Sequence, residues 1–240
     1  MKQLLALTLA LFAVPVMPQS FERTAGMIGI LPLPEVFGSE PCVRFEPREI
    51  PIFRSPATGR PFGKIHVAKP WTYPKEGGCS GLVVQVGTTD SVANESALPT
   101  MEFAYEQPGA IVLRQADSWF EIALPKGTGW IRVKDAERFL SVERLLKDNL
   151  SYLRKNATLP LHTRPGDPVA RRVPPTRTTV DLPVAVQAFM RVADTLWVQV
   201  DLLSANPCTE EKVPEAPASG WLQFHDAKGQ PSVWFWSRGC

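Results

Sequence analysis

The first side chains of this chain to consider for covalent chemistry are four cysteines and three histidines. Cys240 lies at the end of the sequence Ser237-Arg238-Gly239-Cys240. A cysteine attacks as a thiolate, which needs a neighbouring base or cation, and the nearest histidine in the sequence is His225. An even number of cysteines is typical of paired thiols in exported proteins. We therefore expect structural disulfides rather than a catalytic thiol.

The C-terminal Ser-x-Gly-Cys pattern nevertheless resembles that of the L,D-transpeptidases, whose cysteine attacks a peptide carbonyl in peptidoglycan. This resemblance implies a cysteine-dependent cell-wall enzyme with Cys240 as its nucleophile. The chain departs from the family because it lacks an arginine after the cysteine and a His-Gly pair upstream of it. The histidines are scattered, and no glycine-rich phosphate loop occurs. We keep the enzyme as an alternative and expect no catalytic residue, no metal and no cofactor.

Charge and hydropathy indicate where the chain resides. Lys and Arg number 26 against 24 Asp and Glu, and a net charge of +2 gives no electrostatic basis for binding nucleic acid. Lys2 precedes the apolar run Leu4–Val16, a pattern typical of a secretory signal and too short to span a bilayer comfortably. We expect a signal peptide over residues 1–20, a periplasmic or secreted protein, and no membrane span once the signal is removed. An uncleaved anchor is the alternative.

A repeated strand pattern dominates the rest of the chain. Ile111–Val133 predicts three short strands separated by a polar turn and a glycine-containing turn. Met190–Leu202 then matches Leu113–Leu124, and Ser219–Phe224 matches Thr128–Val133. This repeat predicts an all-β chain made of two similar small β units.

Alternation within the repeat predicts the buried face, because successive side chains of a strand point to opposite sides. The inward positions are apolar in both copies: Phe120, Ile122, Leu124, Ile131 and Val133, then Val198, Val200, Leu202, Leu222 and Phe224. The outward face carries Glu121, whose replacement should cost little stability, and four tryptophans, Trp119, Trp130, Trp197 and Trp221. The tryptophans either cover the rim of each unit or form a ligand-binding surface. The pair Trp197 and Trp221 is the better candidate, because the connection between the units could cover the first pair.

The spacing of these tryptophans resembles that of a known domain family. Asp117-Ser118-Trp119 with Gly129-Trp130, and Asp194-Thr195-Leu196-Trp197 with Gly220-Trp221, are similar to the bacterial Src-homology-3-like (SH3b) domain. The resemblance covers residues 45–134 and 158–240. It implies two tandem SH3-like β-barrels that act as a noncatalytic binding or scaffolding module of the bacterial cell envelope. The implied ligand is a peptidoglycan peptide or an envelope protein. An inhibitor or accessory subunit of an envelope protein is a further alternative.

Two segments flank and join the expected barrels. Residues 21–44 predict an extended arm packed on the first barrel, and residues 135–157 predict a helical connector. Within the connector, Ser141–Lys155 has apolar residues at helical spacing and begins with a serine that can cap a helix. This pattern predicts one amphipathic helix joining the barrels.

The repeat also selects among the cysteine pairings. Of the three possible pairings, the one that keeps each disulfide inside one unit is Cys42–Cys79 with Cys208–Cys240. Each bridge would stabilise the chain by roughly 3–4 kcal/mol through loop closure. His162 stands where Phe53 stands in the first copy, so we expect it to be a half-buried aromatic residue.

Overall fold

The computed structural model describes residues 25–33, 49–56, 59–67, 82–86, 95–105, 107–147, 149–154, 160–167, 170–171, 181–208 and 214–237. The expected signal peptide lies outside these residues, as do Cys42, Cys79 and Cys240. Cys208 is described and is not a free thiol, but its pairing with Cys240 stays a prediction. None of the described helices is long and apolar enough to cross a membrane.

The described chain is mostly β-strand with little helix, in agreement with the predicted all-β class. The first sheet contains β1 (Gly29–Leu31), β6 (Thr100–Ala104), β7 (Gln107–Ala116), β8 (Trp119–Ala123), β9 (Thr128–Arg132) and β10 (Leu140–Ser141). The second contains β2 (Ile50–Ile52), β3 (Gly63–Val67), β4 (Leu82–Val86) and β5 (Glu95–Ala97). The third contains β11 (Ser151–Leu153), β12 (Leu161–His162), β13 (Ala170–Arg171), β14 (Leu182–Val192), β15 (Thr195–Leu202), β16 (Ala218–Gln223) and β17 (Val233–Phe235). The helices in the described part of the chain are the 3-10 helix η3 (Ala136–Arg138) and the α-helix α2 (Val142–Leu146).

The sequence repeat corresponds to one strand order that occurs twice. The first sheet runs β10-β1-β7-β8-β9, and the third runs β17-β11-β14-β15-β16 before β12. The strand of the first half that corresponds to β12 is β2. It contacts the edge of the first sheet through a bridge between Phe53 and Trp130, just as β12 pairs with the third sheet through His162 and Trp221. We call the strands from β1 to β10 the first unit and those from β11 to β17 the second unit. The first unit carries β4, β5 and β6 in addition.

The central hairpins of the two units share a β-bulge at the same ladder position. In the first, Val112 pairs with Ile122 and Arg114 with Glu121, so Leu113 is the extra residue. In the second, a pairing shift between Val186 and Ala188 occurs opposite the equivalent residues of β15. A bulge adds one residue to one strand and reverses which face the following residues point to. The second hairpin is also two residues longer in each strand before its turn.

Both hairpins turn through a residue in the left-handed region, Asp117 with φ 51° and Ala193 with φ 49°. In both residues the Cβ crowds the following carbonyl, but aspartate tolerates this conformation better than alanine because its short polar side chain can hydrogen-bond locally. We expect Ala193→Gly to raise the free energy of unfolding by about 0.5–1 kcal/mol, because glycine removes the crowding at some cost in chain entropy. Urea unfolding checks the sign, and Ala188→Gly, inside β14 of the same hairpin, should instead destabilise the chain.

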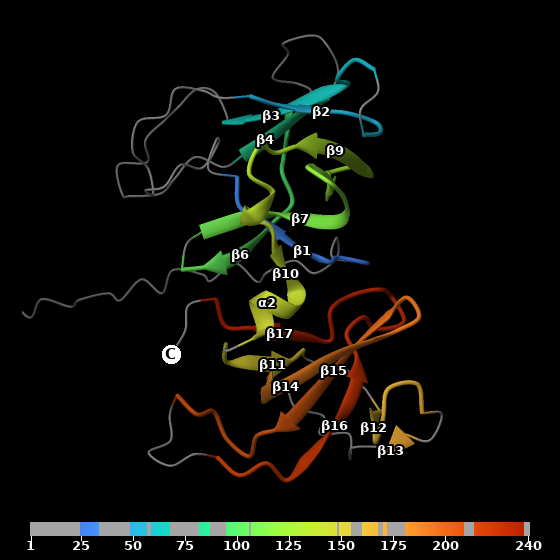
Figure 1. The fold of residues 1–240 in the computed structure, drawn as a ribbon. Helices are drawn as coiled ribbons and strands as arrows, with labels where there is room; N and C mark the ends of the chain where they lie inside the picture. Colours follow the sequence, from blue (N-terminus) through green and yellow to red (C-terminus); the bar gives the residue numbers. More distant parts are fainter. Residues whose placement is uncertain are drawn as a thin grey trace, which may run out of the picture.

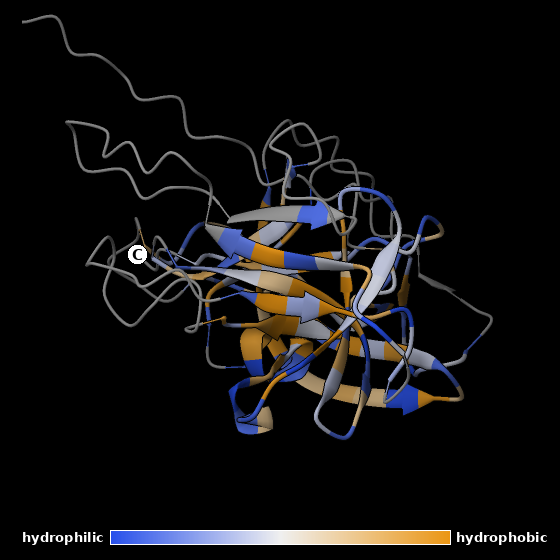
Figure 2. Cartoon of the chain, turned by 90° about the horizontal axis from the view of Figure 1, so that it is seen from above, coloured by the Kyte–Doolittle hydropathy of each residue, from blue (hydrophilic) through white to orange (hydrophobic). Residues whose placement is uncertain are grey.

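The sheets are stacked in layers, with the first sheet in the middle. In Figure 1 the second sheet lies above it, and α2 and the third sheet lie below. One core lies between the first two sheets and includes Ile52, Ile65, Phe120, Ile122 and Ile131. The other contains α2 and joins the lower side of the first sheet to the third sheet. Figure 2 shows how apolar and polar residues alternate along the strands that supply these cores.

The predicted core faces of the repeat are confirmed. Every inward residue named from the alternation is at most 8% exposed, and the central ones, Ile122 and Val200, are fully buried. The predicted cap is also present, since Ser141 Oγ accepts a hydrogen bond from the backbone N–H of Arg144.

The predicted helix over Ser141–Lys155 is wrong in its length. The helix ends at Leu146, and Ser151–Leu153 forms β11, which pairs with both β14 and β17. Pairing on two edges supplies this segment with backbone hydrogen bonds that compete with a helix. The predicted N-terminal arm likewise contains β1, which pairs with β7 and β10 inside the first sheet.

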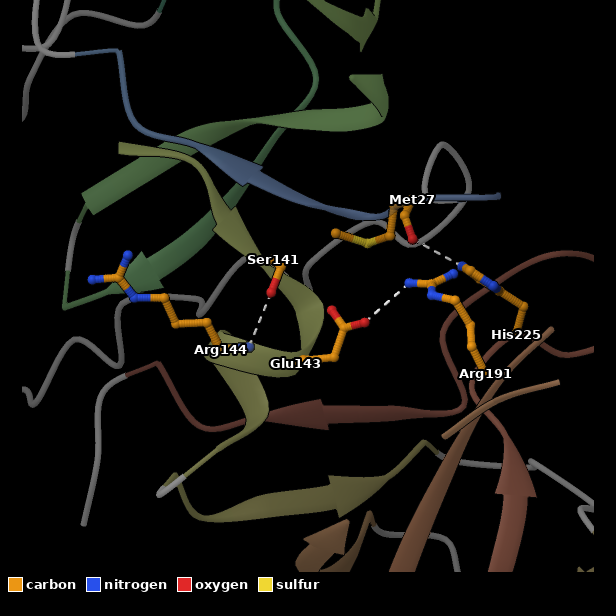
Figure 3. A network of polar contacts seen from close by, with 6 residues as sticks. All are labelled: Met27, Ser141, Glu143, Arg144, Arg191 and His225. Atoms are coloured by element: carbon orange, nitrogen blue, oxygen red, sulfur yellow. Dashed lines mark hydrogen bonds and ion pairs between the residues drawn. The ribbon is translucent and has the colours of Figure 1, made fainter. Parts of the chain in front are cut away.

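The two units are fused rather than joined by a free connector. Met27, Val142, Leu145 and Leu146 are buried in one core together with Phe224 and the inner residues of the third sheet. Figure 3 shows the polar contacts beside this core. Their geometry holds the N-terminal segment and α2 against the second unit.

Hydrogen bonds and an ion pair define that junction. His225 Nε2 donates to the carbonyl oxygen of Met27 at 2.9 Å, and Glu143 Oε1 lies 3.0 Å from Arg191 Nη2. Burial lowers the pKa of His225, which favours the neutral ring in this position. The backbone N–H of Gly26 donates to the carbonyl oxygen of Gly229 at 2.8 Å.

Candidate binding site: two equivalent aromatic clusters

The first unit holds three aromatic residues in one cluster, which we call the first cluster: Phe53, Trp119 and Trp130. Phe53 and Trp130 exchange two backbone hydrogen bonds of 2.8 Å. The ring of Phe53 meets that of Trp119 edge-on, with centroids 5.2 Å apart and an interplanar angle of 86°. This edge-to-face arrangement places a ring edge of positive potential against a ring face of negative potential.

The second unit repeats the cluster as His162, Trp197 and Trp221, which we call the second cluster. His162 pairs with Trp221 on the adjacent strand, and its ring meets that of Trp197 edge-on at 5.1 Å and 89°. His162 Nδ1 donates to the carbonyl oxygen of Asp167 at 2.6 Å. The prediction that His162 is a half-buried aromatic in the place of Phe53 is confirmed.

A glycine precedes the second tryptophan in both units because another strand crosses it there. A Cβ at Gly129 would overlap Cγ2 of the buried Ile52. A Cβ at Gly220 would lie 3.0 Å from both the carbonyl oxygen of His162 and the Cβ of Leu161. Glycine is therefore required before each of these tryptophans because β2 lies close to β9 and β12 lies close to β16.

The tryptophans differ in exposure. Trp130 is 8% exposed and Trp197 4% exposed, whereas Trp119 and Trp221 are half-buried. Each pair lies diagonally on one face: Trp119 faces Arg132 across the ladder and Trp130 faces Glu121, as Trp197 faces Gln223 and Trp221 faces Gln199. The structure thus brings together each of the predicted pairs, and only one member of each pair is open to solvent.

Charged side chains cover the first cluster. The guanidinium of Arg114 lies 5.5 Å from the ring centre of Trp130, and that of Arg132 lies 6.0 Å from the ring centre of Trp119. Arg114 also forms an ion pair with Glu121, which accepts a 2.6 Å hydrogen bond from Thr128 Oγ1. The aromatic rings of the first unit therefore interact with cations from their own chain.

The expectation that Glu121 lies on an open surface is wrong. Glu121 is 6% exposed, and it lies between Arg114, which the bulge in β7 places opposite it, and Trp130 on the other neighbouring strand. The hydrogen bond from Arg114 is the largest cause that lowers the pKa of Glu121, against the opposing effect of burial. Glu121 thus stabilises the chain as a carboxylate.

We expect the contribution of the Glu121 carboxylate to the free energy of unfolding to depend on pH. The pKa of Glu121 is lower in the folded protein than in the unfolded chain, where it is about 4.3. The stability that the carboxylate contributes is therefore fully present above the unfolded pKa and is lost as the pH falls through the folded pKa. We expect Glu121→Gln to lower the free energy of unfolding by about 1 kcal/mol at neutral pH, since Arg114 is largely exposed, and by less near pH 3. Urea unfolding at both pH values tests this, with exposed Glu137→Gln as the control. A difference that does not change with pH would contradict the assignment.

The second cluster has a different chemical surrounding. The ladder places Ala188 where Arg114 stands, Gln199 where Glu121 stands and Gln223 where Arg132 stands. Among the described residues, no cation–π contact involves Trp197 or Trp221. The first cluster is therefore surrounded by charged side chains and the second by uncharged ones at the equivalent positions.

The longer hairpin adds exposed apolar residues beside the second cluster. Met190 pairs with Trp197, and Val192 lies two residues further along the same face. Met190 is 46% exposed and Val192 is 38% exposed. Sequence reasoning missed both residues. Counting alternation from the buried Val184 and ignoring the bulge would put Met190 on the core face.

The remaining candidates for chemistry lie apart from the clusters. His66 Nε2 lies 3.3 Å from Glu95 Oε1 in the second sheet, where His66 is buried and Glu95 is half-buried. Within the described part of the chain, no group of three or more potential ligands could hold a metal ion. The Cys240 sequence lies mostly outside the described residues. No protein-family model, curated protein or solved structure matches the chain.

Proposed function

We propose that this protein is a noncatalytic binding module of the bacterial cell envelope and that its ligand binds the second cluster. The observation that carries this proposal is the divergence of two equivalent clusters. One is covered by its own arginines, while the other is uncharged and bordered by exposed Met190 and Val192. Exposed apolar side chains on the same sheet face as a half-buried tryptophan, here Trp221, are typical of binding surfaces.

We further propose that the two units are tandem SH3-like barrels. Their support is the shared strand order, in which the last strand of each unit returns beside its first. In the first unit the 3-10 helix η3 stands just before that last strand. Gly129-Trp130 and Gly220-Trp221 occupy matching strand crossings, which supports one domain type for both units.

Export and disulfides belong to the same proposal. The apolar N-terminal run supports a signal peptide and a periplasmic or secreted protein. Cys208 is not a free thiol, which supports a Cys208–Cys240 bridge, with Cys42–Cys79 as the second. Mass mapping of the native protein would contradict this pairing if it linked a cysteine of the first unit to one of the second.

A matched pair of tryptophan variants tests the binding site. The full chain would be immobilised and exposed separately to purified peptidoglycan and to solubilised envelope proteins. Trp221→Ala should remove most of the capture, because it deletes the half-buried ring of the second cluster. Trp236→Ala should leave capture unchanged, since Trp236 is 40% exposed and packs on Tyr152 instead. Equal capture by wild type and Trp221→Ala would refute the proposal.

A further inference from the structure

We propose that the ligand of the second cluster is an extended, uncharged apolar segment of a protein, flanked by basic rather than acidic residues. This inference rests on the proposed function and selects one of its two ligand classes. The alternative ligand, a peptidoglycan peptide rich in carboxylates, becomes an outcome of the test.

The surface that carries this inference is a strip across β14, β15 and β16. Its rows follow the ladder: Val192 with Thr195, then Met190 and Gln223 on either side of the buried Trp197, then Ala188 with Gln199 and Trp221. None of these side chains is charged. Neighbouring rows are two residues apart, so the strip is about 13 Å long and matches about four residues of an extended segment.

The composition of the strip fits the centre of a protein interface. Such centres are enriched in tryptophan and methionine and depleted in charged residues. A methionine side chain also adapts its shape to an apolar partner. A carboxylate placed here would lose water without gaining a cation from the strip itself, which is unfavourable.

The charged side chains described near the strip lie at its border. The loop after β12 carries Arg164 and Asp167, and it runs beside the hairpin tip, since a Cβ at Gly166 would lie 3.7 Å from Val192 Cγ1. Asp194 lies in the turn of the hairpin, and Asp201 lies at the other end of the strip. Among the described residues with described side chains, three acids and one arginine therefore border an uncharged centre, and this balance favours basic flanking residues in the ligand.

The first cluster provides an internal comparison. Its equivalents of Ala188 and Gln223 are Arg114 and Arg132, which would attract a carboxylate. The second cluster lacks both cations and has Met190 where the first has Ala116. The unit with the more open apolar surface is thus the one least suited to an anionic ligand.

The test uses random dodecamer peptides displayed on phage and selected on the immobilised full chain. Selected sequences should contain a short uncharged apolar centre with Lys or Arg beside it and few Asp or Glu. A synthetic copy of a selected peptide should bind wild type and weaken about tenfold or more with Met190→Glu. Val192→Glu should act in the same direction, and Tyr105→Glu, at an exposed apolar residue of the first unit, should bind as wild type does.

Four results would overturn the inference: acidic selected peptides, no selected peptide, selected peptides that bind folded Met190→Glu and Val192→Glu unchanged, or self-association of the wild type that Met190→Glu removes. If peptidoglycan is captured in a Trp221-dependent way and peptides are not, the inference fails while the proposed function stands. If Trp221→Ala changes no capture at all, the proposed function itself fails.

Discussion

Leu146→Ala is expected to lower the free energy of unfolding of the whole chain by about 2–5 kcal/mol, and both units should unfold in one transition. Leu146 is fully buried in α2, within the core that the first and third sheets share. The lost methyl groups would leave a cavity between the units. Because Met27 and Val142 lie in the same core, neither unit can repack without disturbing the other.

Urea unfolding followed by hydrogen exchange distinguishes a shared loss from a local one. Peptides covering β8 and β15 should lose protection together in Leu146→Ala. Lys147→Ala is the matched control, since Lys147 is the exposed next residue and should change stability by less than about 0.5 kcal/mol. Two separate transitions, with only one affected by the substitution, would show that the units are independent.

Trp197→Ala is expected to cost about 3–5 kcal/mol, because Trp197 is 4% exposed and packs against His162. The sequence alone predicts a different result, in which the variant loses binding while the fold stays intact. Burial in the second cluster makes Trp197 chiefly a packing residue. Trp221 is the half-buried member of the pair, so we expect its replacement to weaken binding while the fold stays intact.

Thermal or urea unfolding of Trp197→Ala beside Trp119→Ala tests this assignment. The two tryptophans occupy the same ladder position in their units, but Trp119 is half-buried and so should cost less when truncated. Equal losses would contradict the difference in burial between the clusters.

Several features of the fold follow from short-range patterns that the sequence displays directly. Alternation predicts the buried faces of β8, β9, β15 and β16, because a strand directs every second side chain to the same side. The internal repeat predicts two units of one kind and places His162 in the position of Phe53. Gly129 and Gly220 precede their tryptophans in both copies because the crossing strand leaves no room for a side chain.

Other features depend on contacts between distant segments and required the tertiary structure. The apolar spacing from Val142 to Leu153 is compatible with one long helix and with a helix followed by a short strand. The last part of this segment forms a strand because β11 pairs with both β14 and β17. Nothing local marks Gly29–Leu31 as a sheet strand or Met27 as part of a core shared by both units. The positions of these segments depend on which sheet edges and apolar faces the rest of the chain leaves unpaired or uncovered.

The candidate site also depends partly on local sequence patterns and partly on contacts between distant segments. The sequence by itself determined the four tryptophans and their pairing on one face of each unit. Only the tertiary structure decided that Arg114 covers Trp130 while Met190 stands exposed beside Trp197. A single extra residue in β7 and in β14 reverses the alternation beyond it, and the position of such a bulge is set by pairing with the neighbouring strand rather than by the residues of the bulged strand alone.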